Sequence, residues 1–189
     1  MSPRDCSAFR TLAPRLALPC ALLGALALGG CSSESSQPTP GASSPTFVGA
    51  DPGAGPVVYL RGGNAAPGGL AIEVVGRGVP NVYGLAFRIE STAGVLVPGT
   101  LTASPSWSAS ALSVEREPVP GLLVVGLSER GSAAGFAADA DVLLGTLDFQ
   151  IGAAAATPVT FVDGECAVAQ ASGGELAAVR WVGGAIELR

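Results

Sequence analysis

Apolar residues alternate with small or polar residues in a series of short segments along the last two thirds of the chain. The clearest are residues 83–89, 123–127 and 147–151, where Tyr, Leu, Phe, Val or Ile fills every second position. A period of two places these side chains on one face of a strand, and glycine- and proline-rich turns separate the segments. The pattern predicts an all-β domain of roughly nine short antiparallel strands, arranged as a jelly-roll β-sandwich.

Two weaker patterns concern the same domain. Segments 179–182 and 185–188 flank Gly183 and Gly184, and two glycines between strand segments predict a tight hairpin. Residues 132–141 are the one stretch whose composition suits a brief helical turn, although Gly135 disfavours it. We therefore expect strands to form nearly all of the regular structure.

Residues 57–189 are long enough to bury one hydrophobic core, which predicts a single domain over this range. Cys166 is the only cysteine in it, so an internal disulfide is excluded. Because the chain has no histidine to activate a thiol, we expect Cys166 to serve as a small buried side chain.

The N-terminus has the features of an export signal. Arg4, Arg10 and Arg15 are followed by an apolar run over residues 16–28, which is too short to span a bilayer as a helix. The run ends in Leu-Gly-Gly-Cys at residues 28–31, which resembles the bacterial lipobox. The resemblance implies that residues 1–30 are a lipoprotein signal peptide and that the new N-terminal cysteine is acylated.

The lipobox resemblance therefore identifies Cys31 as the lipid-attachment residue and predicts an anchor in the lipid bilayer of the cell envelope. Ser32 follows the cysteine, and by analogy with sorting in Gram-negative bacteria this residue favours the outer membrane. Residues 31–56 consist mainly of Ser, Pro, Gly, Thr and Ala, with little apolar surface to offset the entropy of ordering. We expect this stretch to be a disordered tether.

The charge of the chain argues against a nucleic-acid partner. Ten Arg and Lys residues oppose fifteen Asp and Glu residues, which gives a net charge of −5. Removal of the signal peptide takes away more positive than negative charge and leaves the mature chain still more acidic. Nucleic-acid binding depends on neutralising phosphates, so a chain of this charge is a poor candidate.

The sequence also argues against an enzyme. Histidine, the commonest general base and metal ligand, is absent. Acidic residues do occur in close pairs, but such spacing does not place two carboxylates across a cleft, as glycoside hydrolysis requires. We predict a protein that binds without catalysing a reaction, and we expect no cofactor.

A structural calcium ion is the one metal that the residues suggest. Asp139, Asp141, Asp163 and Glu165 lie in predicted loops and carry the hard oxygen donors that calcium prefers. These four residues are the candidate ligands, although the spacing of an EF-hand loop is absent.

Three segments together resemble the cohesin domain, a relative of carbohydrate-binding modules. These are Val-Tyr-Gly-Leu-Ala-Phe at residues 82–87, Leu-Gly-Thr-Leu-Asp-Phe at 144–149 and Thr-Pro-Val-Thr-Phe at 157–161. The resemblance covers nearly all of residues 57–188 and implies a nine-stranded jelly roll. It also implies a partner, because one sheet face of a cohesin grips a dockerin, a small calcium-loaded helical module. It assigns no contact residues in this chain.

Three functions remain open at this point: binding of a dockerin-type protein, binding of a polysaccharide, and a structural role in the envelope. Glycan-binding modules usually present a row of exposed aromatic side chains, and aromatic residues are scarce here. Trp181 lies on a predicted strand and is expected in the core. Trp107 lies among serines in a predicted loop, where we expect it to be exposed.

Overall fold

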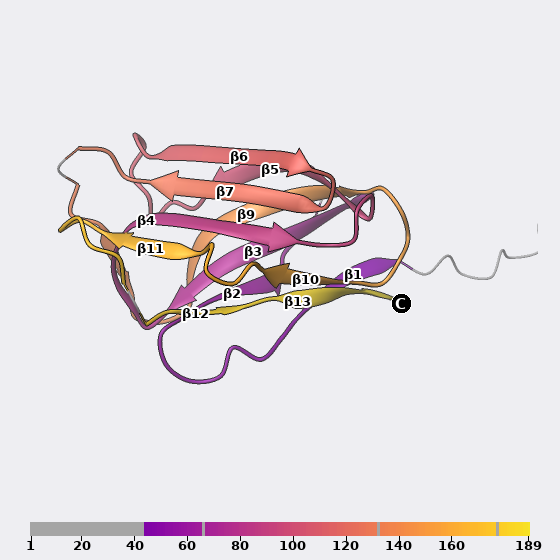
Figure 1. Cartoon of the computed structure of the whole chain (residues 1–189), viewed down its shortest axis with the longest axis horizontal. Coiled ribbons are helices and arrows are strands. Elements are labelled where there is room, and N and C mark those ends of the chain that lie inside the picture. The colour runs from indigo at the N-terminus through magenta and orange to yellow at the C-terminus, as the bar shows by residue number, and fades with distance from the viewer. Residues whose placement is uncertain (1–43, 66, 132, 177) are drawn as a thin grey trace, which may run out of the picture. The chain divides into compact units, whose positions relative to one another are not determined.

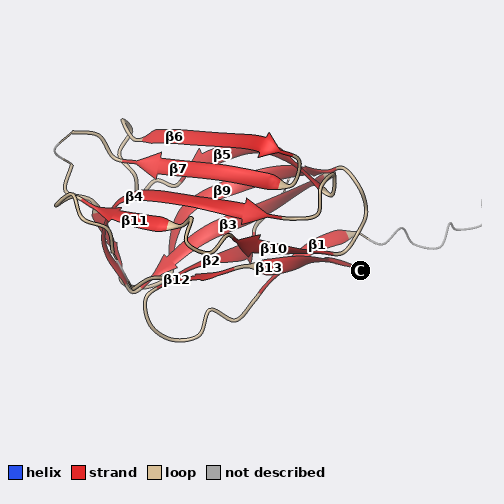
Figure 2. Cartoon of the chain, in the orientation of Figure 1, coloured by secondary structure: helices blue, strands red, loops and turns tan. Residues whose placement is uncertain are grey.

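The computed structural model describes residues 44–65, 67–131, 133–176 and 178–189. The predicted signal peptide, Cys31 and most of the predicted tether lie outside the described residues. Every regular element within the described ranges is a strand, as Figure 2 shows. None of the described segments forms a helix of the length and apolarity that a bilayer crossing needs.

The strands form two sheets that pack face to face, seen as a front and a rear layer in Figure 1. In chain order the strands are β1 (Pro45–Gly49), β2 (Val57–Gly62), β3 (Gly69–Arg77), β4 (Val79–Glu90), β5 (Leu96–Ala103), β6 (Leu112–Val119), β7 (Leu122–Ser128), β8 (Phe136–Ala138), β9 (Val142–Ile151), β10 (Thr157–Phe161), β11 (Ala167–Gln170), β12 (Arg180–Val182) and β13 (Gly184–Leu188).

The eight-stranded sheet has the order β1-β13-β10-β4-β7-β6, and β8 and β11 also pair with β4. The five-stranded sheet has the order β12-β2-β3-β9-β5. All neighbouring strands run antiparallel except β12 and β2, which are parallel. The all-β sandwich predicted from the alternating pattern is therefore confirmed. The described residues form thirteen strands in place of about nine, because several are only three to five residues long.

The core lies between the two sheets and is built by the alternating residues. Leu85, Phe87 and Ile89 of β4 are buried on one side, and Ile72 and Val74 of β3 are buried on the other. Residues between them on β4 point away from the core, which leaves the other face of this sheet for contact with solvent or a partner.

Strand β1 corrects the predicted boundary of the tether. It lies within residues 31–56, yet it pairs along its whole length with β13, where Phe47 is opposite Ile186. Phe47 is buried in the main core, so this one aromatic residue supplies apolar surface that the composition of the stretch concealed. The domain therefore includes the strand at residues 45–49, and the described residues from 44 to 189 belong to one compact unit that contains every described strand.

The predicted hairpin at Gly183 and Gly184 is wrong. β12 belongs to the five-stranded sheet and β13 to the eight-stranded sheet, so the chain crosses from one layer to the other at these glycines. A Cβ atom at Gly183 would collide with the carbonyl oxygen of Val159, and one at Gly184 with that of Val48. The two glycines allow close backbone approach and do not form a turn between paired strands.

The predicted helical turn near residues 132–141 is also wrong. Phe136–Ala138 forms β8, which pairs with β4 opposite Val79 and Val82. Gly135 has a φ of +71°, a left-handed conformation that no α-helix can contain, and it directs the chain into the strand.

Candidate functional site

The outward face of strands β6, β7, β4 and β11 is the candidate site, and we call it the outer face. Pairing registers align its side chains in three rows across the strands. The first row contains Leu112, Ser128, Gly84 and Ala169; the second contains Val114, Gly126, Ala86 and Ala167; the third contains Arg116, Val124 and Arg88.

The first two rows form a shallow apolar groove with a volume of about 340 Å³. Its floor consists of glycine and alanine residues of β4, β7 and β11. Leu112 and Val114 of β6 rise beside this floor, with 45% and 62% of their surfaces exposed. Large apolar side chains that stay exposed beside an open groove are typical of an interaction surface.

The glycines of the floor differ in what they do. A Cβ atom at Gly84 would lie 3.3 Å from the Cβ atom of Ala169, so the close approach of β11 favours a glycine there. A Cβ atom at Gly126 would meet no atom within 4 Å. Gly126 also has no positive φ, so neither backbone strain nor packing requires glycine at this strand position.

The third row places positive charge beside the groove. Arg116 is exposed on β6, and Arg88 of β4 is partly exposed, with its Nη1 atom 3.4 Å from the Glu165 carboxylate. The outer face is therefore divided into an apolar part and an adjoining part with two guanidinium groups.

The loop before β6 is fixed by two buried side chains. Trp107 is 5% exposed, and its indole Nε1–H donates to the backbone oxygen of Leu144 at 2.7 Å. The buried carboxylate of Glu129 accepts hydrogen bonds from the backbone N–H of Ser108, at 2.8 Å, and from the Ser108 hydroxyl. The expectation that Trp107 is exposed is wrong, and the residue instead helps to hold the start of β6, where Leu112 lines the groove.

No aromatic platform is present on the surface of the described residues. Trp181 is half-buried and packs against Phe87 and Phe161, with ring centroids 6.1 and 5.0 Å away. This confirms its predicted contact with the core. Of the other aromatic residues described, Tyr83 and Phe136 are half-buried and the rest are buried.

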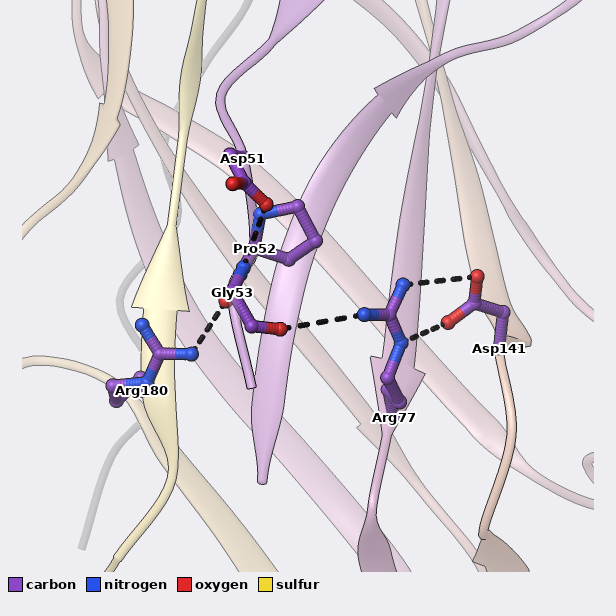
Figure 3. A network of polar contacts seen from close by, with 6 residues as sticks. All are labelled: Asp51, Pro52, Gly53, Arg77, Asp141 and Arg180. Carbon is purple, nitrogen blue, oxygen red and sulfur yellow. Dashed lines mark hydrogen bonds and ion pairs between the residues drawn. The ribbon is translucent and has the colours of Figure 1, made fainter. Parts of the chain in front are cut away.

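The four calcium candidates are not brought together. Asp141 forms a two-pronged ion pair with Arg77, with distances of 2.5 and 3.1 Å, as Figure 3 shows. The hydrogen bonds from Arg77 lower the pKa of the Asp141 carboxyl. Glu165 faces Arg88, and Asp139 and Asp163 are exposed. No three acidic or cysteine side chains in the described ranges converge as metal ligands, so these residues do not form the expected site.

The same arginine network holds the segment between β1 and β2. Arg180 donates to the backbone oxygen of Pro52, and Arg77 donates to that of Gly53 at 3.4 Å (Figure 3). Arg180 also donates to the backbone oxygen of Ala54 at 2.7 Å. These contacts fasten the chain where it passes from one sheet to the other, and Asp141, one of the four calcium candidates, pairs with Arg77 of this network.

The outer face was not found from the sequence. From the sequence, Gly84 and Ala86 are only the small residues that alternate with core positions, and Gly126 receives no role. The signal that could have found the groove is the coincidence of small outward-facing residues on strands that become neighbours, which requires knowledge of strand order.

Comparison with known proteins supports the architecture. No protein-family model and no curated protein sequence matches the chain. Solved structures do match: a type II cohesin of the Acetivibrio cellulolyticus cellulosome has a TM-score of 0.59 at 10% identity, covering 70% of this chain and 95% of that one. The sixth cohesin of scaffoldin B from the same organism, solved with a dockerin, has a TM-score of 0.58 at 16% identity, covering 70% and 97%.

A third match comes from another organism and belongs to a glycoside hydrolase. The cohesin module of a family 33 glycoside hydrolase from Clostridium perfringens has a TM-score of 0.51 at 10% identity, covering 68% of this chain and 99% of that one. The three matches each span almost the whole of a cohesin module. Residues 44–189 of this chain therefore have the fold of a cohesin domain.

Proposed function

We propose that the protein is a non-catalytic binding module, tethered to the cell envelope, that holds a dockerin-like partner protein against its outer face. The observation that carries the proposal is the open apolar groove on β6, β7, β4 and β11, beside which Leu112 and Val114 stay exposed. Apolar surface left open in this way is stabilised when a partner covers it.

The distribution of exposed apolar residues supports a binding role for β6. Three of the five large hydrophobic residues exposed in the described part of the chain lie on this strand: Leu112, Val114 and Val119. Arg116 follows Leu112 and Val114 on the same side of the strand, whereas Glu115 lies opposite the core residue Val125 and belongs to the other side, so the outer face of β6 presents apolar side chains with a positive charge beside them. Protein interfaces have this composition, with an apolar centre and a polar rim.

A protein partner accounts for this face better than a polysaccharide does. Sugar rings stack on exposed aromatic side chains, and the described residues offer none that is fully exposed. The groove instead has walls and a floor of aliphatic and small residues, which suit the side chains of another protein. The solved cohesin of scaffoldin B is bound to a dockerin, which supports a dockerin-like partner for this chain.

The tether is a separate part of the proposal and rests on the sequence. The Leu-Gly-Gly-Cys pattern supports acylation of Cys31 and a membrane anchor, and Ser32 after the cysteine favours the outer membrane. Replacement C31S is expected to abolish incorporation of labelled palmitate and to release the protein from the membrane fraction. The C166S variant is the matched control and should remain lipidated. Equal labelling of both variants would refute the anchor.

Partner binding is tested by capture from the envelope and secreted proteins of the producing bacterium. Residues 40–189 carry the whole described core and would be immobilised through their N-terminus, which leaves the outer face free. We expect the wild-type domain to capture a protein with calcium-loop repeats. A chelator should abolish this capture, and the V114D variant should capture at least tenfold less of the protein. The matched control is V97D, since Val97 is an exposed valine of the other sheet.

Two results would overturn the assignment. One is an absence of any enriched protein with the wild-type domain. The other is equal loss of capture with V97D and V114D, because a specific outer-face site predicts that only the second variant fails.

A further inference from the structure

We infer that the groove receives one bulky apolar side chain of the partner, and that a carboxylate one helical turn away from that side chain pairs with Arg88 and Arg116. The inference rests on the proposed function, because it specifies the chemistry of the partner that the outer face selects. It follows from three features of the outer face: Gly126, which neither packing nor backbone conformation requires to be glycine, the size of the groove, and the position of the two arginines.

Gly126 gives the first argument. A glycine inside a strand is unfavourable relative to alanine, because it gives up more backbone entropy on folding and has no side chain to pack. Gly84 is explained by the approach of Ala169, whereas nothing within 4 Å explains Gly126. The effect of the missing side chain is to keep the middle of the groove open between Val114 and Ala86, the neighbours of Gly126 in the second row.

The size of the groove gives the second argument. Its volume of about 340 Å³ lies at the lower end of the range of about 300–1,000 Å³ that is usual for ligand pockets. Its lining is almost entirely aliphatic, glycine or alanine, with Ser128 as the one polar side chain. An apolar pocket of this size suits a single large anchor such as Leu, Met, Phe or Trp, the kind of residue that dominates binding energy at interfaces.

The arginines give the third argument. Arg116 and Arg88 stand on either side of Val124 in the third row, next to the second row that contains Gly126. Successive rows are two residues apart along each strand, which is about 7 Å. Residues i and i+4 of an α-helix are separated by about 6 Å along its axis. A helix laid along β7 therefore presents an apolar side chain to the groove and an acidic one to the guanidinium groups. Arg116 is the main partner of this carboxylate, because Arg88 already faces Glu165 at 3.4 Å and would be shared between the two acids.

The experiment uses 4-phenylbutyrate as a probe, since it joins an aromatic ring to a carboxylate. Binding to residues 40–189 is followed through the backbone amide signals in ¹⁵N-edited NMR spectra. We expect saturable shifts, in the millimolar range, that cluster at Gly84, Gly126 and Ala167. The matched cation 4-phenylbutylamine is expected to bind at least fivefold more weakly, because the arginines repel it.

Two variants show whether the groove is the site. G126L fills it, and because a Cβ atom at this position meets no neighbour and glycine is unfavourable inside a strand, the variant is expected to fold with a thermal transition no lower than that of wild type. The control T160L adds a leucine to the outward side of β10, outside the groove. We expect G126L to lose at least nine tenths of the probe-induced shift and T160L to keep it.

The inference is overturned if G126L binds the probe like wild type, if the shifts lie outside the groove, or if the amine binds as tightly as the carboxylate. Its failure is distinct from failure of the proposed function. If V114D abolishes capture of a partner and G126L preserves it, the partner binds the outer face but inserts no apolar side chain into the groove. Absence of any captured partner would refute the binding function whatever the probe does.

Discussion

Replacement of Trp107 by phenylalanine tests the account of how the loop before β6 is held. The indole is buried, donates its N–H to the Leu144 oxygen at 2.7 Å and stacks edge-on against Phe136 with ring centroids 5.0 Å apart. Phenylalanine keeps an aromatic ring in this place and removes the donor. The variant therefore isolates the hydrogen bond and the difference in ring size.

The expected cost follows from these two losses. The Leu144 oxygen keeps a second hydrogen bond, from the backbone N–H of Ser104 at 3.2 Å, so no buried carbonyl is left without a partner. Loss of the indole hydrogen bond then costs about 1 kcal/mol. The smaller ring leaves roughly 40 Å³ empty, which costs about 1 kcal/mol at about 24 cal/mol per Å³. W107F should lower the free energy of unfolding by about 2 kcal/mol.

Urea denaturation followed by circular dichroism measures this change without relying on the fluorescence of the replaced residue. The corresponding fall in Tm is roughly 4–8 °C for a domain of this size. W107A should cost more, about 3–5 kcal/mol, because it leaves a larger cavity. A change within about 0.5 kcal/mol for W107F is what an exposed loop tryptophan would give, and that result would refute the buried position of Trp107.

Three further predictions concern acid stability, thiol reactivity and backbone packing. The lowered pKa of Asp141 means that its ion pair stabilises the fold above the unfolded pKa of about 3.9 and loses this effect as pH falls through the folded value. In acid titrations D141N should therefore lose less stability than wild type below about pH 4, and an equal loss would contradict the pairing. Burial raises the pKa of the Cys166 thiol, so iodoacetamide at neutral pH should alkylate Cys166 more slowly than it alkylates the thiol of free glutathione. Equal alkylation rates of the two thiols, after correction for the accessibility of Cys166, would contradict this. G183A forces a Cβ atom against the Val159 oxygen and should cost about 1–3 kcal/mol in urea denaturation, whereas G174A, with no neighbour closer than 3.9 Å, should be nearly neutral; similar costs would contradict the crossover geometry.

Local pattern was sufficient to predict the fold class and most strands. Period-two alternation depends only on which face of a strand is buried, so segments such as residues 83–89 and 123–127 were assigned correctly. The resemblance to cohesins also led to the right architecture, as the solved cohesin structures agree. The strand at residues 45–49 was missed because a single Phe47 in a proline- and glycine-rich stretch does not form a pattern.

Features that depend on strand order could not be predicted. Gly183 and Gly184 read locally as a hairpin, and only the assignment of β12 and β13 to different sheets shows their role in close packing. Trp107 looked exposed among serines, because nothing in the sequence shows that the Leu144 oxygen lies within reach of its indole.

The candidate site was the least predictable part for the same reason. Its groove is formed by residues from β4, β6, β7 and β11, whose small side chains carry no motif and become neighbours only in the folded sheet. The four calcium candidates are likewise not brought together by the fold, and Asp141 pairs with Arg77, a residue distant in the sequence.

The central claim is that a partner protein binds to the outer face, and photocrosslinking tests it most directly. A benzophenone side chain would be introduced at position 114 on β6, or at position 97 on the opposite sheet, in the intact protein on the bacteria that produce it. We predict a discrete crosslinked species from position 114, identified by mass spectrometry as a protein with calcium-loop repeats, and no corresponding species from position 97. Crosslinking from position 97 alone, or from neither position, would contradict the account.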